Sequence, residues 1–156
     1  HLTGHGASLS LVGLTISLHV AGMYALAPVF GWLADRVGRR PVVLLGQAAF
    51  TASLVLAWRG PDAPALVALS LVLLGLGWSA ATVAGSALVT EAVPPAGRPQ
   101  LQGVSDLLMN LAGAAGGALA GPVLALVGFD GLSAALLVPV AVVVLLHRGR
   151  RPAAVA

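Results

Sequence analysis

Long stretches without a formal charge are the feature that most constrains this chain. A helix rises about 1.5 Å per residue, so roughly 17–25 apolar residues cross the hydrocarbon core of a bilayer. Five stretches of that length contain no Asp, Glu, Lys or Arg: 1–34, 41–58, 63–90, 107–129 and 131–147. We therefore expect an all-α integral membrane protein with transmembrane helices at about 9–34, 41–58, 64–91, 101–128 and 131–147.

The composition excludes several other classes of protein. Only 8% of the residues are charged and 58% are hydrophobic, whereas about a quarter of a soluble domain is charged. A water-soluble globular enzyme and a disordered chain are both excluded. The net charge of +3 and the 4% aromatic content do not support nucleic-acid binding. The chain has no cysteine, which excludes disulfides, thiol nucleophiles and iron–sulfur sites.

Glycine and proline divide the chain into helices. The apolar stretches lack the alternating polarity of outer-membrane strands, and a lone strand cannot satisfy its backbone in lipid. Proline restricts the residue before it and lacks an N–H donor, so proline clusters end one helix and begin the next. Such breaks occur near 38–41, 60–64, 94–99 and 128–131, and Pro28, Pro122 and Pro139 should kink the spans that contain them.

Small residues recur at helical spacing in two spans. Gly113, Gly117 and Gly121 form one row, and Gly77, Ala81 and Gly85 form another. Small residues at this spacing allow helix backbones to approach closely in lipid. We interpret both rows as packing within the bundle rather than as a dedicated dimer face.

The arginines predict the orientation of the chain. Five spans divide them into Arg59 on one side and Arg36, Arg39, Arg40, Arg98, Arg148, Arg150 and Arg151 on the other. Cytoplasmic loops are enriched in arginine and lysine, so the N-terminus is predicted outside the cell and the tail 148–156 in the cytoplasm. The membrane is predicted to be the plasma membrane. The chain starts at His1 and has no basic segment at its start, so we expect that it carries no signal peptide. We expect that it comes from the interior of a longer reading frame.

Residues 31–40 carry a motif. They read GWLADRVGRR, which resembles the signature loop of the major facilitator superfamily, G-x-L-A-D-R-x-G-R-[RK]. Glu91 and Arg98, separated by six residues, resemble the E-x6-R pair that closes a later helix in that superfamily. The resemblance implies that Glu91 pairs with a loop arginine, that Asp35 meets a helix N-terminus, and that these contacts close the inside of the transporter.

We call this set the cytoplasmic latch: Gly31, Asp35, Arg36, Gly38, Arg39, Arg40, Glu91 and Arg98. The alternative is that the arginines only anchor the topology, which explains a basic loop but not the glycines and acidic residues.

The resemblance also implies which part of a transporter this is. The superfamily has twelve spans in two six-helix halves. The five spans then form most of one half-bundle, and residues 1–156 are a partial domain. The N-terminal half of the same transporter is missing from this sequence. The absence of an arginine in Leu71–Trp78 and the basic tail favour spans 8–12 of a bacterial drug or solute transporter. The complete form of the signature loop favours spans 2–6.

Ionisable and polar groups inside the spans are candidates for proton coupling or substrate contact. His19 lies mid-span, where a histidine side chain suits proton coupling, or else it is a neutral histidine hydrogen-bonded to a carbonyl or to Thr15. Asp106 and Asn110 share one face of the fourth span, where Asp106 lines the inner vestibule or is a structural charge. Gln47, Thr51 and Trp78 are further candidates for substrate contact.

No catalytic constellation, metal motif or cofactor motif is present in the sequence. We therefore expect a non-enzyme: a fragment of a secondary transporter moving a small organic solute by alternating access, either facilitatively or by proton-coupled efflux as an antiporter. The alternatives are an integral-membrane enzyme or assembly subunit, and an inactive truncated transporter. The sequence does not specify the substrate, the coupling ion or the direction of transport.

Overall fold

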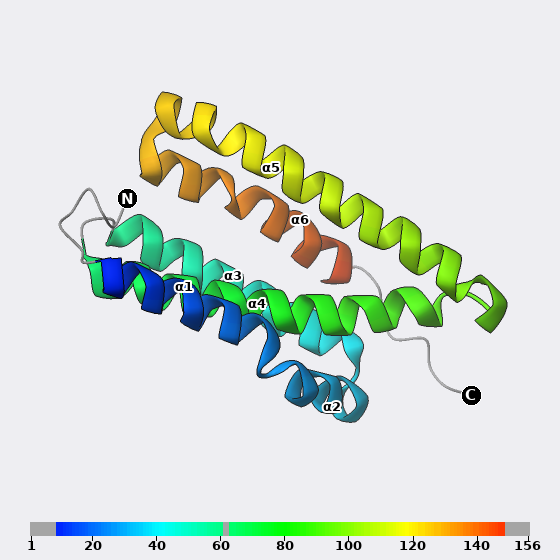
Figure 1. Cartoon of the computed structure of the whole chain (residues 1–156). Helices are drawn as coiled ribbons and strands as arrows, with labels where there is room; N and C mark the ends of the chain where they lie inside the picture. The colour runs from blue at the N-terminus through cyan, green and yellow to red at the C-terminus, as the bar shows by residue number, and fades with distance from the viewer. Residues whose placement is uncertain (1–8, 61–62, 149–156) are drawn as a thin grey trace.

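The computed structural model describes residues 9–60 and 63–148, and within these ranges it contains helices and no strand (Figure 1). The elements in chain order are α1 (Leu9–Tyr24), α2 (Ala27–Val37), α3 (Arg39–Arg59), α4 (Pro64–Glu91), the 3₁₀ turn η2 (Pro95–Gly97), α5 (Arg98–Ala135) and α6 (Leu137–Arg148). Among the described residues, four segments are long and apolar enough to cross a membrane, namely Leu9–Val37, Arg39–Arg59, Pro64–Glu91 and Pro95–Gly128, and Gly131–His147 is a shorter apolar helix. The expected all-α membrane fold is confirmed.

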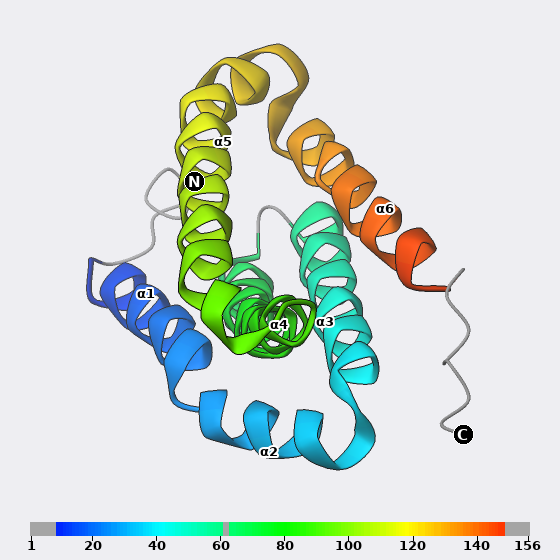
Figure 2. The same ribbon diagram turned by 90° about the vertical axis from the view of Figure 1, so that its right-hand side faces the viewer.

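Helix α4 is the centre of the bundle. It contacts α1, α2, α3 and α5, and Figure 2 shows it end-on with these helices around it. Helix α6 packs against α3 and runs antiparallel to α5 (Figure 1). Every other described helix therefore takes its position from the α3–α4 pair, directly or through one neighbour.

Two of the three prolines inside the predicted spans, Pro28 and Pro139, lie close to a break between two helices. A proline ring clashes with the carbonyl of the residue four positions earlier, which is Tyr24 for Pro28 and Ala135 for Pro139. Helix α1 ends at Tyr24 and α5 ends at Ala135. Helix α5 continues through Pro122 without a break. The first span is thus two helices joined at a bend, as the position of Pro28 predicts.

Gly128 separates the fourth and fifth predicted spans. Its backbone angles, φ 70° and ψ −179°, lie outside the helical region although the residue falls inside α5, near its C-terminal end. A residue with a Cβ rarely adopts a positive φ, so glycine permits this reversal. The chain then returns along α6, and the break falls at the start of the predicted 128–131 turn.

Helices α3 and α4 approach closely through small residues. A Cβ built on Gly46 would lie 2.8 Å from the carbonyl oxygen of Gly77 and 2.9 Å from the amide nitrogen of Ala81. The predicted row on α4 therefore packs at Gly77 and Ala81, whereas no described residue lies within 4 Å of a Cβ on Gly85.

The glycine row on α5 behaves differently. Nothing in the described chain lies within 4 Å of a Cβ on Gly113, Gly117 or Gly121, and residues 106–119 are all exposed. The expected packing of this row within the bundle does not occur among the described helices. The reason is positional, since only the two ends of α5 lie near α3, α4 and α6 in Figure 2.

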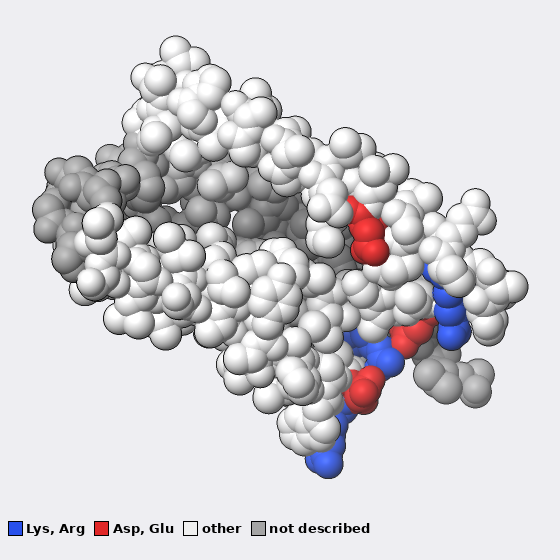
Figure 3. Space-filling view, in the orientation of Figure 1, with Lys and Arg blue, Asp and Glu red and all other residues white. Residues whose placement is uncertain are grey.

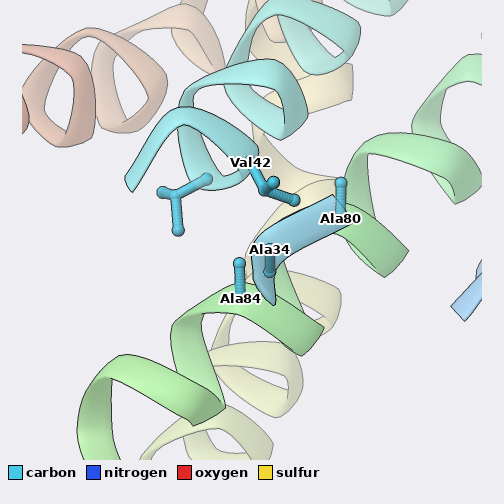
Figure 4. Close-up of a cluster of buried hydrophobic side chains, with 5 residues drawn as sticks. Ala34, Val42, Ala80 and Ala84 are labelled. Atoms are coloured by element: carbon cyan, nitrogen blue, oxygen red, sulfur yellow. The ribbon is translucent and has the colours of Figure 1, made fainter. Parts of the chain in front are cut away.

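A small hydrophobic cluster fixes the helices at one end of the bundle (Figure 4). Val42 of α3 and Ala84 of α4 are fully buried, and Ala34 of α2 and Ala80 of α4 are 3% and 1% exposed. Alanine at three of these positions lets three helices meet at short distances. Ala34 belongs to the GWLADRVGRR motif, so this cluster sets the position of the motif against α3 and α4.

Candidate functional site

The charged residues gather at one end of the bundle. Helices α2 and α4 end there and α3 and α5 begin there, which brings together Asp35, Arg36, Arg39, Arg40, Glu91 and Arg98. Figure 3 shows blue and red side chains at this end of the visible face. Arg59, at the other end of the 21-residue helix α3, is about 30 Å away. We call the populated end the arginine-rich end.

The last predicted span also ends here. His147 of α6 lines a cavity together with Arg40 and Glu91, and α6 ends one residue later at Arg148. Arg150 and Arg151 lie outside the described residues.

A single residue joins α2 to α3. Gly38 has φ 95° and ψ 155°, a region that glycine occupies without the clash of a Cβ. Because the connection is this short, the last turn of α2 and the first turn of α3 are adjacent. Asp35 and Arg39 are thereby brought within reach of each other.

Arg39 is the centre of the charged cluster. Its Nη2 lies 2.8 Å from Glu91 Oε1 of α4 and 3.2 Å from Asp35 Oδ1 of α2. Its Nη1 donates a hydrogen bond to the carbonyl oxygen of Ala34 at 3.3 Å. One guanidinium therefore links α2, α3 and α4 at the arginine-rich end.

These ion pairs are only moderately strong. The side chains of Arg39, Asp35 and Glu91 are 29%, 71% and 52% exposed. Exposed pairs of this kind contribute about 0.2–1 kcal/mol each because water screens them. The cluster can thus stabilise one arrangement of the helices and still be broken by a modest free energy.

The other latch residues are distributed around Arg39. The guanidinium of Arg36 lies 4.8 Å from the centroid of the Trp32 ring, a cation–π arrangement. Arg40 lines the cavity beside Glu91. Arg98 is the first residue of α5. Among the described residues, a Cβ on Gly31 would meet only Val83 Cγ1, at 3.8 Å.

Two details of this cluster were not specified by the sequence. The motif offered three arginines as partners of Glu91, and the structure pairs Arg39. Asp35 was expected at a helix N-terminus; it pairs with Arg39, the first residue of α3, but no side chain caps that helix. The contact between Arg36 and Trp32 could have been predicted from the sequence, because Trp32 precedes Arg36 by one helical turn.

His19 lies where α1 packs on α4. Its Nδ1–H donates to the carbonyl oxygen of Leu71 at 2.7 Å, and the ring is partly buried. Thr15 instead donates to the carbonyl of Leu11 in its own helix. The backbones are close here, because a Cβ on Gly75 would collide with the carbonyl oxygen of His19.

A structural role for His19 gives a testable outcome. In the full-length protein, His19→Asn keeps a donor near the Nδ1 position and should retain thermal stability, whereas His19→Leu should lose about 0.5–1.5 kcal/mol with the hydrogen bond. The melting temperature in detergent reports both. The pH profile of transport by His19→Asn should match that of the parent. A flattened profile would instead assign proton coupling to His19.

Asp106 and Asn110 lie on the exposed face of α5. Gln102 Nε2 donates to Asp106 Oδ1 at 2.9 Å, and Asn110 Nδ2 donates to the backbone carbonyl of Asp106 at 2.7 Å. All three residues thus bond within their own helix. Thr51 likewise donates to the Gln47 carbonyl, and Trp78 packs edge-on to Tyr24 with centroids 5.8 Å apart. In the described part of the chain, no three acidic or histidine residues could together hold a metal ion.

Comparison with known proteins identifies the family. A sequence model described as Major Facilitator Superfamily matches residues 2–155. The chain belongs to the major facilitator superfamily. The motif, the four long apolar segments with the shorter apolar helix, and the arginine-rich end of this superfamily member are consistent with that match. The comparison with solved structures finds no match.

Curated relatives in the superfamily are transporters. The chain is 44% identical over 126 residues to the MFS-type transporter YddS of Bacillus subtilis, covering 80% of this chain and 29% of the relative. It is 38% identical over 149 residues to YdeG of the same organism, covering 91% and 35%. It is 32% identical over 108 residues to the riboflavin transporter RfnT of Brucella anthropi, covering 69% and 27%. The chain thus spans about a third of the length of these relatives.

Proposed function

We propose that this chain is part of a secondary transporter that moves a small organic solute across the plasma membrane by alternating access. The observation that carries the proposal is the position of Arg39, whose guanidinium joins the ends of three helices within the superfamily's signature loop. A contact that links helix ends at one face of a bundle controls whether those ends separate. Separation of helix ends is what opens a transporter toward that side.

The cytoplasmic latch works as a reversible closure in this proposal. With the Arg39–Glu91 and Arg39–Asp35 pairs formed, the ends of α2, α3 and α4 are held together and the cytoplasmic side is closed. Two partly exposed pairs contribute about 0.4–2 kcal/mol in total. Substrate binding or a proton can supply that much free energy, so the closure can be released in each cycle.

The remaining parts of the proposal concern the whole protein. The chain supplies spans 8–12, and an N-terminal half supplies the other wall of the pathway. The arginine-rich end faces the cytoplasm and the N-terminal end of α1 faces outward, which the distribution of Arg36, Arg39, Arg40 and Arg98 against Arg59 supports. A small organic substrate agrees with the names of relatives such as the riboflavin transporter. Proton-coupled efflux is the mode we propose, with Asp106 as the carboxyl group to test, because His19 is expected to act structurally through its hydrogen bond to Leu71.

Replacing Asp35 tests the proposed function. In the full-length protein, Asp35→Asn removes one of the two carboxylates on Arg39 and should lower the rate of transport about 1.4- to fivefold, because an exposed pair contributes about 0.2–1 kcal/mol. Uptake or efflux in proteoliposomes measures this, with membrane insertion checked by surface labelling. Arg59→Gln, at the opposite end, is the matched control and should transport normally. Normal transport by Asp35→Asn would contradict the latch.

A further inference from the structure

The bend between α1 and α2 lies against the middle of α4, and Figure 2 shows the two helices meeting at this bend. Before the bend, a Cβ on Gly22 of α1 would lie 3.2 Å from the carbonyl oxygen of Val72. After the bend, a Cβ on Gly31 of α2 would lie 3.8 Å from Val83 Cγ1. Residue numbers rise in the same direction along both partners. The turn of α4 midway between these two contacts therefore faces the bend.

Ser79 is the polar residue of α4 at the level of the bend. It follows Gly75, which faces α1, by one helical turn and precedes Val83, which faces α2, by one turn. Ser79 is 0% exposed, and among the described residues its hydroxyl has no hydrogen-bond partner. The hydroxyls of Thr51 and Ser70, in contrast, donate to carbonyls of their own helices. Because a buried polar group without a partner is unfavourable, this arrangement of the helices is not the best one for Ser79.

The bend offers a hydrogen-bond acceptor. In a continuous helix the carbonyl of Tyr24 would accept from the amide of residue 28, but Pro28 has no N–H. The ring of Tyr24 packs edge-on to that of Trp78, the residue before Ser79, with centroids 5.8 Å apart. An acceptor that has lost its helical donor and a donor without an acceptor thus lie at the same level of the bundle.

The two helices joined at the bend are held in different ways. Helix α1 is fixed along α4, because His19 bonds to Leu71 and a Cβ on Gly75 would collide with the carbonyl oxygen of His19. Helix α2 leaves room for a Cβ at Gly31 and is held at its far end, where Arg39 contacts its last turns. If the cytoplasmic latch is released, α2 can therefore swing about the bend while α1 stays in place.

We propose that the α1–α2 bend is a hinge with two positions, which differ in the hydrogen bonding of Ser79. In the closed position the latch is formed, as in this structure, and the Ser79 hydroxyl is unpaired. In the open position α2 has swung away from α4, and the Ser79 hydroxyl donates to the carbonyl of Tyr24. The bond gained at the bend opposes the ion pairs of Arg39, so neither position is strongly favoured. This inference rests on the proposed function of the latch, and it makes Ser79 a residue that promotes opening.

The test measures how often the arginine-rich end opens when Ser79 is replaced. Leu88 packs against the cluster that contains Ala34 of α2, so Leu88→Cys reports the departure of α2. In the full-length protein, with any other cysteine replaced by serine, a membrane-impermeant maleimide is applied from the cytoplasmic side. Ser79→Ala should lower the rate of labelling about three- to tenfold, the effect of one hydrogen bond lost from the open position. Ser86→Ala, at a partly exposed serine of the same helix, is the control and should label at the parent rate.

A second variant tests whether Tyr24 is the acceptor. Pro28→Ala returns an N–H to the Tyr24 carbonyl, so in that background Ser79→Ala should change the rate of labelling by less than about twofold. An equal fall in both backgrounds would overturn the proposal, because the hydroxyl would then act on another group.

The remaining outcomes separate the hinge from the latch. If Ser79→Ala only raises the midpoint of thermal unfolding and leaves the rate of labelling unchanged, Ser79 is merely a packing residue and the hinge is refuted. That result together with faster labelling in Arg39→Glu would leave the latch intact. Unchanged labelling in Arg39→Glu would instead refute the latch, and with it the opposition between latch and bend that the hinge requires.

Discussion

Gly46→Ala is expected to lower the free energy of unfolding by about 1–3 kcal/mol, the usual cost of forcing an extra methyl into a packed site. The new Cβ would lie 2.8 Å from the Gly77 carbonyl oxygen and 2.9 Å from the Ala81 nitrogen. Both are backbone atoms of α4, which cannot rotate away. Because α3 and α4 position the other helices, their separation should loosen the whole half-bundle. The midpoint of thermal unfolding of the full-length protein in detergent measures the effect.

The same substitution at Gly85 is the matched control. In the part of the chain that the structure describes, nothing lies within 4 Å of a Cβ on Gly85, which also lies in a helix long and apolar enough to cross a membrane. Alanine stabilises a helix by about 1 kcal/mol relative to glycine. Gly85→Ala should therefore leave the midpoint of thermal unfolding unchanged or raise it. Opposite signs for the two variants are the expected result. If Gly46→Ala is as stable as the parent, the close α3–α4 crossing is wrong.

Arg39→Glu is expected to reduce transport about five- to thirtyfold. The substitution places a third carboxylate beside Asp35 and Glu91, replacing two attractions with repulsions that change the closure by about 1–2 kcal/mol, a factor of about 5–30 in population. The cytoplasmic side should then open more often. Labelling of a cysteine at Leu88→Cys, which lines the cavity beside Arg40 and Glu91, should increase from that side, and this chain contributes no cysteine of its own.

The reciprocal exchange separates the ion pair from other effects of the mutation. Arg39→Glu combined with Glu91→Arg restores opposite charges between α3 and α4 and should recover part of the transport and of the protection at Leu88→Cys. The single substitution Glu91→Arg should behave like Arg39→Glu. If the double variant is no better than the two single variants, Arg39 and Glu91 do not act as a pair. High salt should weaken the parent closure as well, because the pair is partly exposed.

The helical membrane fold could be predicted because lipid leaves few alternatives. A stretch without charges such as 63–90 must satisfy its backbone internally, and a helix does so using only its own residues. The bend at Pro28 was predictable for the same reason, since proline acts on its own helix. The motif also located the charged end, because ten consecutive residues that join two helices carry their own geometry.

The partners of individual side chains could not be predicted in this way. Which of Arg36, Arg39 and Arg40 reaches Glu91 depends on the rotation of α3 against α4, and that rotation is set by the contacts of Gly46, Gly77 and Ala81. The glycine row of α5 has the same spacing as the row of α4, yet it packs against no described helix. Spacing places small residues on one face of a helix, but it does not say whether another helix covers that face.

The sequence by itself therefore determined the solvent of this chain, its helical character and the end at which its charges collect, because each of these depends on interactions within one segment and with the membrane. Only the tertiary structure decided that Arg39 joins three helices and that His19 bonds to Leu71 of α4. These features depend on how residues far apart in the chain approach one another, and that approach follows from packing at backbone distances rather than from any local pattern.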